Sequence, residues 1–248
     1  MKKIWLIGAS EGIGRALAEE LGQDVDNFLI LSARDSDRLE SLSSHIKTKS
    51  MFCRVDVADN ASVENGWKEI KSKVETIDTL IYCAGYYRPM SSEDIKVEEI
   101  EKIIDINLVG AYRVLTHVVP EFIRKKDGHI ALVSSIAGYR GLPKDTGYGS
   151  SKAGLIHLAE NLRCDLSIHN IKVQIINPGF VKTRLTDLND FKMPSLMTTK
   201  QAAVLIKKGL ESRGFEIRFP FIFSSFIKIL SLLPYRIYFW LTKKTNQN

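Results

Sequence analysis

Short apolar runs alternate with amphipathic stretches along most of the chain. The apolar runs have the length and composition of buried strands, and they cover residues 3–8, 27–33, 51–56, 79–83, 129–134 and 172–177. Between them lie stretches of helical periodicity, at about 12–21, 36–46, 61–74, 97–124 and 147–168. Strands that alternate with helices predict an α/β fold, a doubly wound parallel sheet with helices on both faces. Ligands bind such sheets at the carboxyl ends of the strands, so the side chains there are the first candidates for chemistry.

The chain has 248 residues, of which 44% are hydrophobic, enough for the core of one α/β domain. We expect that domain over residues 1–218, with a short lid at about 180–199, and a basic, aromatic C-terminal extension over 219–248. The cysteines Cys53, Cys83 and Cys164 have neither metal nor disulfide spacing, which is typical of a reducing compartment. The first apolar run ends at Gly8 and is too short for a signal peptide, so we expect a cytoplasmic protein.

The net charge of +6 belongs to the C-terminal part of the chain. Residues 200–248 hold nine Lys or Arg and two acids, whereas residues 1–199 hold 26 basic and 27 acidic residues. A nearly neutral body argues against nucleic acid as a partner. The five histidines show no ligand spacing, so no metal is predicted.

An apolar, aromatic run occupies residues 220–241 of the extension. Lys228 and Arg236 interrupt it and Pro234 breaks a helix, so a membrane-spanning helix is not expected. Basic, aromatic and amphipathic segments are typical of membrane interfaces, which indicates peripheral contact with the inner face of a membrane through 219–244. An oligomer contact or a cover over the binding pocket would account for the same residues, and both interpretations stay open.

A glycine-rich turn leads from the first strand into the first helix, with the sequence Gly8-Ala9-Ser10-Glu11-Gly12-Ile13-Gly14. Glycines at these positions permit a tight turn and a close approach of the backbone to a pyrophosphate, which then faces the helix N-terminus. A strand before the turn and a helix after it are the context that dinucleotide binding requires. We therefore predict a dinucleotide cofactor.

The second strand ends in Ala33-Arg34-Asp35, about 20 residues past the loop, where the ribose 2′-position is read. The Arg34 guanidinium fits a 2′-phosphate and Arg15 is a second candidate charge, which favours NADP over NAD. If Asp35 binds the ribose instead, Arg34 is a solvated residue and NAD is the cofactor. Asp56, at the end of the third strand, is a candidate for the adenine amino group or for the N-cap of the following helix.

Tyr148 and Lys152 are four residues apart at the start of a predicted helix, so their side chains share one face. A tyrosine that titrates near 10 is a poor acid-base at neutral pH, and lowering its pKa by about three units takes about 4 kcal/mol. A neighbouring ammonium group supplies much of that stabilisation. Ser135 ends the fifth strand, where its hydroxyl can hold a carbonyl oxygen while Tyr148 donates a proton and a hydride reaches the carbon.

In these residues the chain resembles the short-chain dehydrogenase/reductase family, over about residues 1–215. The shared motifs follow the family's order: the glycine loop, Asp56, Ala84-Gly85, Asn107, Ser135, Tyr148, Lys152 and Pro178-Gly179 with Thr183. The resemblance implies a Rossmann-type sheet, a tetrad of Asn107, Ser135, Tyr148 and Lys152, and a homodimer or homotetramer built on long helices. It also implies that Asn107 positions a water linking Lys152 to solvent, although an Asn at this place could instead cap or kink the helix.

The resemblance further implies where a cofactor is held. The contacts are expected from Gly8, Ser10, Glu11, Gly12, Ile13, Gly14, Arg34, Asp56, Val57, Cys83, Ala84, Gly85, Tyr148, Lys152, Pro178, Gly179, Val181 and Thr183. Two departures concern this region: family members usually open the loop with Thr and carry Asn-Asn-Ala-Gly after the fourth strand, whereas this chain has Ile7 and Tyr82-Cys83-Ala84-Gly85. These changes put the rigidity of the loop in question and leave the tetrad intact. We interpret Cys83 as a small buried residue rather than a reactive thiol.

The leading hypothesis is an NADP(H)-dependent oxidoreductase that interconverts a carbonyl and an alcohol on a small or lipophilic substrate. Candidates for the substrate wall are the apolar lid residues Phe191, Met193, Leu196 and Met197, together with Tyr139, Arg140, Leu142 and Pro143 after Ser135, although the Met and Phe side chains could equally pack the lid. The alternatives are a non-redox epimerase or dehydratase with a tightly bound cofactor, and a non-catalytic dinucleotide-binding regulator. An intact tetrad argues against the regulator.

Overall fold

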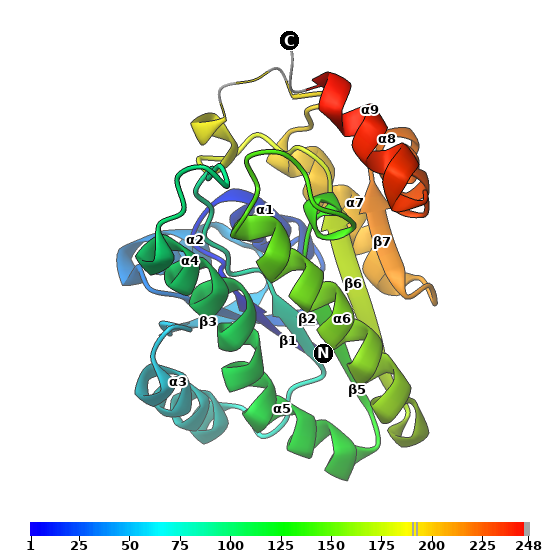
Figure 1. Ribbon diagram of the computed structural model, residues 1–248. Coiled ribbons are helices and arrows are strands. Elements are labelled where there is room, and N and C mark those ends of the chain that lie inside the picture. Colours follow the sequence, from blue (N-terminus) through cyan, green and yellow to red (C-terminus); the bar gives the residue numbers. More distant parts are fainter. Residues whose placement is uncertain (190, 192, 246–248) are drawn as a thin grey trace.

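A seven-stranded parallel sheet forms the centre of the molecule in the computed structural model (Figure 1). Its strands, in the order β3-β2-β1-β4-β5-β6-β7, are Lys49–Arg54, Asn27–Ala33, Lys2–Ile7, Thr79–Tyr82, Gly128–Val133, Ile171–Pro178 and Glu216–Phe219. The structure describes residues 1–189, 191 and 193–245. Residues 190 and 192 of the expected lid and 246–248 of the expected extension lie outside the described residues.

Helices cover both faces of this sheet (Figure 1). They are α1 (Gly12–Leu21), α2 (Ser36–His45), α3 (Asn60–Lys73), α4 (Val97–Ile104), α5 (Gly110–Lys125), α6 (Tyr148–Leu166), α7 (Thr199–Glu211), α8 (Phe221–Ser231) and α9 (Tyr235–Thr245). Apolar side chains of α3, α5 and α6 form one core with one face of the sheet. Those of α1, α2 and α7 form a second core on the other face. The predicted doubly wound α/β fold is confirmed.

Three details differ from the sequence prediction. The helix expected over 97–124 is divided by a π-helical segment, Asp105–Val109, which contains Asn107. The run 220–241, of which the sequence indicated only that Pro234 breaks a helix, forms two helices, with Pro234 between α8 and α9. A seventh strand, β7, pairs with β6 and was not anticipated, since its four residues are too few to show a strand pattern.

Strands β1, β2 and β3 are added toward one edge of the sheet and β4 to β7 toward the other, so the strand order reverses between β1 and β4, which are adjacent. The loops that follow them meet at the carboxyl edge, where a crevice opens between the two helical layers. The backbone N–H groups of Gly8 and Cys83 bond to Ser32 and Ile7 across this edge, at 2.7 and 2.9 Å. The sheet therefore fixes the glycine loop against the turn after β4.

A neutral histidine is built into the core between β5 and β6. The His129 ring is 6% exposed, and its Nε2 lies 2.8 Å from Oε1 of Gln174. The amide nitrogen of Gln174 donates to three carbonyls, those of Gly209, Ser212 and Gly214, so its oxygen must accept from His129. Burial is the largest cause that lowers the pKa of His129, to about 3, and nearby Lys172 adds to it.

This pKa predicts a loss of stability in mild acid. Between pH 6.5 and about 3 the unfolded chain binds a proton at His129 that the folded chain does not, so lowering the pH favours unfolding. The unfolding free energy should fall by about 1.4 kcal/mol per pH unit from this group within that window, and not above it. Denaturant titrations at a series of pH values measure the slope. His129→Gln should flatten it, the exposed-site control His45→Gln should not, and equal slopes for both variants would contradict the assignment.

Candidate active site

A cleft of about 550 Å³ runs along the carboxyl edge of the sheet. Every residue expected to hold a cofactor lines it, from the glycine loop, the ends of β2, β3 and β4, and the segment after β6. Ser135, Tyr148 and Lys152 line it as well, while Asn107 lies behind it. Residues far apart in the chain are thus brought together as predicted from their positions at strand ends.

The glycine loop is shaped by contacts that a side chain would prevent. Gly8 has φ +85°, and a Cβ there would lie 2.6 Å from the backbone nitrogen of Ala84. A Cβ on Gly14 would overlap the carbonyl oxygen of Gly8. At the N-cap of α1, Glu11 makes no capping hydrogen bond with its side chain, so the first N–H groups of the helix have no side-chain cap. Exposed amides at a helix N-terminus suit an anion such as a pyrophosphate.

Two arginines, Arg34 and Arg38, stand at the end of the cleft beside β2. Arg34 is exposed, and Arg38 makes ion pairs with Asp35 at 3.1 Å and Glu11 at 2.8 Å. Arg15 is not among the lining residues and pairs with Glu19 on its own helix, so the structure replaces it with Arg38 as the second charge. The sequence signal for Arg38 was its place one helical turn after Arg34.

The structure shows the contacts of Asp56 and Asp35, whose roles as helix caps or cofactor contacts the sequence left open. The N-cap of α3 is Asp59, so Asp56 does not cap that helix and instead accepts from Ala58 N within the turn, at 3.0 Å. Asp35 caps α2 by accepting from Arg38 N at 3.1 Å. Both side chains line the cleft, but that of Asp35 is already engaged by Arg38.

Tyr148 is the first residue of α6, and Lys152 lies one turn further on the same face. The Lys152 ammonium is 5.5 Å from the centre of the Tyr148 ring and donates to the carbonyl of Val133 at 2.9 Å. Lys152 is buried, with 3% of its surface exposed. Ser135 follows β5, and its hydroxyl is hydrogen-bonded to Tyr148 and accepts from Ala137 N. A hydroxyl, a phenol and an ammonium group therefore meet at one end of the cleft.

Asn107 lies in the π-helical segment and binds the loop after β4. Its Oδ1 accepts from Tyr86 N at 2.7 Å, and its Nδ2 donates to Tyr86 O and to the Ser151 hydroxyl. A Cβ on Gly85 would lie 3.8 Å from both Asn107 Oδ1 and Lys152 Nζ, so the glycine separates the two side chains. The helix is thus locally distorted at Asn107, in keeping with the kink that the sequence allowed.

The residue that replaces the family's first asparagine supports this distortion. The ring of Tyr82 is buried, and its hydroxyl donates to the carbonyl of Ile106 in the π-helical segment at 2.5 Å. Burial raises the pKa of the adjacent Cys83 thiol to about 11. Cys83 is therefore a protonated thiol at neutral pH, as expected for a small packing residue.

Burial dominates the titration of the reacting groups. It lowers the pKa of Lys152 to about 8. It raises the pKa of Tyr148 above the usual value, the charge of Asp145 adds to the rise, and the hydrogen bond with Ser135 opposes it. The pKa of Asp145 itself rises to about 7 through burial, and one of its oxygens is buried without a hydrogen-bond partner in the described part of the chain. Burial therefore opposes the phenolate form of Tyr148.

Aromatic pairs involve Tyr148 and the segment after β6. Tyr87, which the sequence analysis missed, packs edge-on against Tyr148 with ring centres 4.9 Å apart. Phe180 lies against Phe191 of the expected lid at 5.7 Å. Tyr139 and Arg140, expected in the substrate wall, instead bind Glu216 and the end of α8. Position along the chain alone could not show which way these side chains turn.

Within the described residues, no group of His, Cys, Asp and Glu side chains is arranged to hold a metal ion.

The chain matches a family model and several known proteins. The family model for short chain dehydrogenases matches residues 2–192. The chain is 32% identical to an uncharacterized oxidoreductase of Myxococcus xanthus, covering 92% of this chain and 90% of the relative. It is 30% identical to the 3-oxoacyl-[acyl-carrier-protein] reductase FabG of Staphylococcus aureus, covering 80% and 82%.

A solved structure extends the match to three dimensions. The alcohol dehydrogenase of the archaeon Thermococcus sibiricus, complexed with 5-hydroxy-NADP, superposes with a TM-score of 0.77 at 25% identity, covering 88% of this chain and 96% of that one. Fold, motifs and relatives thus point to one kind of enzyme, which uses NAD or NADP to oxidise CH–OH or reduce C=O groups. The chain belongs to the short-chain dehydrogenase/reductase family.

Proposed function

We propose that this enzyme is an NADP(H)-dependent reductase and dehydrogenase of a carbonyl–alcohol pair, with Tyr148 as its acid-base. The observation that carries the proposal is that Tyr148, Lys152 and Ser135 lie together in the same cleft that the glycine loop lines. The uncapped start of α1 and the close approach of Gly8 to Ala84 fit a dinucleotide laid along that cleft.

The residues divide the reaction among them. When bound, the nicotinamide cofactor supplies or accepts the hydride at the carbonyl carbon. Ser135 holds the carbonyl oxygen with its hydroxyl, and Tyr148 donates its proton to that oxygen, which becomes the alcohol. In the oxidative direction the Tyr148 phenolate takes the alcohol proton back. Lys152 stabilises the phenolate through its positive charge.

Because the pKa of Tyr148 is raised, the role we propose for Lys152 is to stabilise the Tyr148 phenolate. Burial opposes the phenolate, so an opposite charge close to the ring is needed to offset it. The Lys152 ammonium lies within 5.5 Å of the ring centre and shares its low-dielectric surroundings, where charges interact more strongly than in water. A positively charged nicotinamide ring adds to the same effect.

For Asn107 we propose a positioning role. Both hydrogens of its side-chain amide are used within the protein, on Tyr86 O and the Ser151 hydroxyl. Its share in a proton relay from Lys152 is therefore to hold the π-helical segment in place behind Gly85, rather than to donate to a water through its side chain.

We expect Tyr148→Phe to lower turnover by about a thousandfold, because general acid-base catalysis is lost while the ring is kept. The dissociation constant for NADPH should stay within about threefold, since the phenol oxygen adds little to cofactor binding. NADPH consumption with a panel of aldehydes and ketones finds a substrate, and fluorescence titration measures binding. Tyr235→Phe, an exposed residue of α9 outside the cleft, is the matched control and should keep full turnover. Turnover that survives in Tyr148→Phe would disprove the assignment.

For the cofactor we propose NADP(H) in preference to NAD(H). Arg34 and Arg38 offer two guanidinium groups beside the ribose end of the cleft, and a phosphate takes such groups in bidentate fashion. Asp35, the acid that would favour a ribose hydroxyl, is held by Arg38 and the start of α2. The complex of the Thermococcus sibiricus relative with an NADP derivative agrees with this choice.

The double variant Arg34→Ala with Arg38→Ala should weaken NADPH binding by roughly tenfold to a hundredfold, through loss of charge-assisted hydrogen bonds to the 2′-phosphate. NADH binding should change by less than about threefold, because NADH lacks that phosphate. Fluorescence titrations with both cofactors measure the two constants. Arg15→Ala, outside the cleft, is the control and should alter neither. An equal loss for NADH and NADPH would show that the arginines do not read the phosphate.

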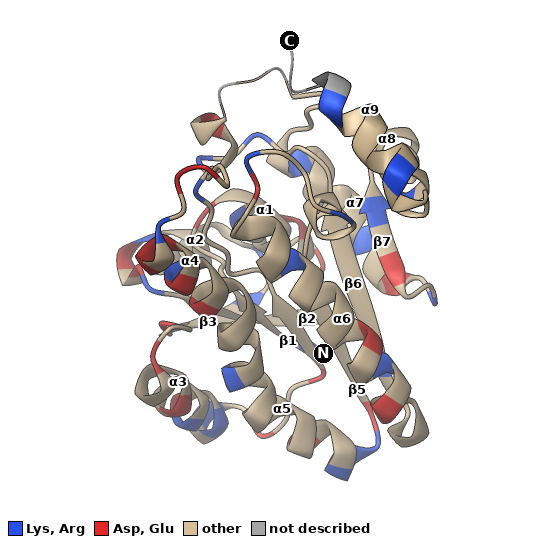
Figure 2. Cartoon of the chain, in the orientation of Figure 1, with Lys and Arg blue, Asp and Glu red and all other residues tan. Residues whose placement is uncertain are grey.

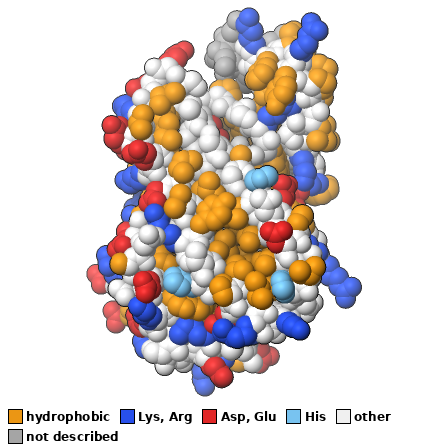
Figure 3. Space-filling view, turned by 60° about the horizontal axis from the view of Figure 1, so that its bottom comes forward, with side chains coloured by type: hydrophobic (Ala, Val, Ile, Leu, Met, Phe, Trp, Pro, Cys, Tyr) orange, Lys and Arg blue, Asp and Glu red, His pale blue; other side chains and the backbone are white. Residues whose placement is uncertain are grey.

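We propose a homodimer or homotetramer in the cytoplasm. Figure 3 shows hydrophobic side chains gathered over the face that α5 and α6 present, where Tyr112 is 48% exposed. An apolar face of this kind is suited to burial between two copies. The three cysteines are free, in agreement with a reducing compartment. Peripheral membrane contact through 219–244 is part of the same proposal, and the surface that would make it is the hairpin of α8 and α9.

A further inference from the structure

The hairpin of α8 and α9 exposes an unusual amount of apolar surface. On α8, Ile222, Phe226 and Ile229 are 85%, 56% and 62% exposed, and their spacing places them on one stripe of the helix. Leu232, Tyr235 and Phe239 continue it across the turn and along α9. We call these six residues the hairpin surface. Side chains of this size in one patch mark a binding surface rather than ordinary solvent-exposed positions.

The charge of the same segment has one sign. No acidic residue follows Glu216, whereas five basic residues do: Arg218, Lys228, Arg236, Lys243 and Lys244. Arg218 and Lys228 make ion pairs with Glu216, at the root of the hairpin. Arg236 and Lys243 are exposed on α9 beside the apolar residues. In Figure 2 the ribbons of α8 and α9 carry blue, basic positions and no red, acidic ones.

We propose that the hairpin surface docks on an anionic lipid bilayer. Basic residues beside exposed aromatic rings suit the headgroup region, with the rings at the interface and the cations on lipid phosphates. A second copy of the chain fits less well, because a symmetric contact would set Arg236 and Lys243 against a surface bearing the same charges. Among the described residues there is no helix with the length and composition to cross a bilayer, so the hairpin lies along the surface.

The hairpin is bound tightly to the loop that follows the catalytic serine. One guanidinium nitrogen of Arg140 donates to the carbonyls of Leu230, Ser231 and Leu233, at 3.3, 2.8 and 2.6 Å, where α8 ends. The same group lies over the rings of Tyr235 and Tyr238, 4.6 and 4.1 Å from their centres. These contacts combine a helix C-terminal cap with a cation–π pair.

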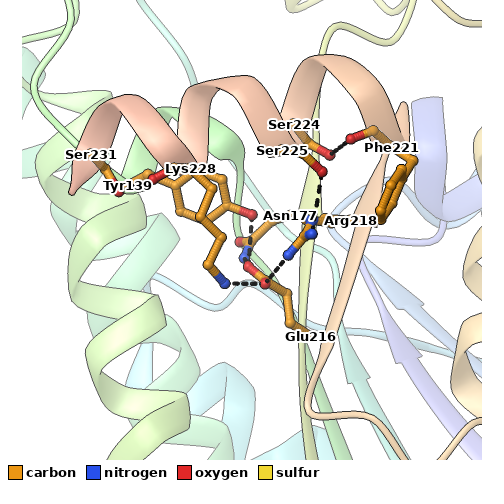
Figure 4. A network of polar contacts seen from close by, with 9 residues as sticks. All are labelled: Tyr139, Asn177, Glu216, Arg218, Phe221, Ser224, Ser225, Lys228 and Ser231. Atoms are coloured by element: carbon orange, nitrogen blue, oxygen red, sulfur yellow. Dashed lines mark hydrogen bonds and ion pairs between the residues drawn. The ribbon is translucent and has the colours of Figure 1, made fainter. Parts of the chain in front are cut away.

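The Glu216 carboxylate makes a second set of contacts that attaches the hairpin to the rest of the protein. Glu216 accepts from the Tyr139 hydroxyl at 2.6 Å, from Asn177 Nδ2 at 2.8 Å and from Arg218 at 3.1 Å, and it binds Lys228 of α8 as well (Figure 4). Tyr139 lies shortly after Ser135, and Asn177 precedes the Pro178-Gly179 turn of the cleft. Burial raises the pKa of Glu216, but hydrogen bonds from Lys228, Tyr139 and Asn177 outweigh it and hold this pKa below its usual value. The hairpin is therefore fixed to both sides of the reacting end.

Phe180 joins the hairpin to the lid as well, since its ring packs between Phe191 and Phe223. Docking of the hairpin thus holds the mouth of the active site at a set height and angle above the lipid. This inference stands apart from the catalytic proposal, because it concerns binding and requires no turnover.

Flotation with vesicles tests the docking surface directly. The full-length protein should bind vesicles of phosphatidylcholine with phosphatidylglycerol, and bind phosphatidylcholine alone at least about tenfold more weakly. Ile222→Ser, Phe226→Ser and Ile229→Ser together should reduce binding by more than about tenfold. Val25→Ser, Val97→Ser and Ile168→Ser together are the matched control, since those side chains are also exposed but lie elsewhere, and they should leave binding unchanged.

Charge is tested in the same assay. Arg236→Gln, Lys243→Gln and Lys244→Gln should reduce binding by about fivefold for each cation removed, whereas Lys47→Gln, Lys49→Gln and Arg213→Gln remove the same charge elsewhere and should have little effect. Circular dichroism and NADPH titration verify that each variant is folded. Absence of vesicle binding, or equal loss in test and control variants, would overturn the proposal. So would a change from oligomer to monomer in the apolar hairpin variant during sedimentation, since the surface would then be a contact between copies.

Discussion

A lysine ammonium held away from water is the constraint on which the active site depends. Lys152 is 3% exposed, and in the described part of the chain its nitrogen is matched by the carbonyl of Val133 and the ring of Tyr148. A buried cation is costly without such partners, so the elements that supply them must pack closely. Gly138 lies directly on the backbone of Lys152, and the Ser134 hydroxyl donates to its carbonyl at 2.8 Å. Close packing of α6 on the segment that follows β5 therefore sets the geometry of Ser135, Tyr148 and Lys152 together.

The nucleotide end of the cleft also depends on close packing, but there the groups that come close are backbone atoms rather than a buried charge. Gly8 and Gly14 let strand β1, helix α1 and the turn after β4 approach to distances that a Cβ would forbid. Two ends of one cleft are thus built by different means: glycines where the backbone must come close to an anion, and buried polar contacts where a proton must move. At the nucleotide end, the Glu11 carboxylate joins two segments of the chain, because it binds Arg38 after β2 and Arg184 after β6.

The C-terminal hairpin adds a surface to this enzyme without entering its cleft. Tyr139 and Arg140, which the sequence placed in the substrate wall, take part in attaching the hairpin instead: Arg140 binds the end of α8, and Tyr139 binds Glu216. Tyr87 packs against Tyr148, and Phe180 packs against Phe191 of the expected lid and Phe223 of α8. One aromatic side chain therefore contacts both the expected lid and the hairpin.

The sequence by itself determined the α/β fold and the group of residues that meet in the cleft, because strand periodicity, glycine placement and motif order are local properties and parallel strands all end at one edge. Only the tertiary structure decided that Arg38 rather than Arg15 joins Arg34, since helix rotation sets which side chain faces the cleft. It likewise decided that Tyr139 and Arg140 serve the hairpin, that Asn107 distorts its helix, and that burial raises the pKa of Tyr148. Each of these depends on neighbours distant in the chain, which no local pattern encodes.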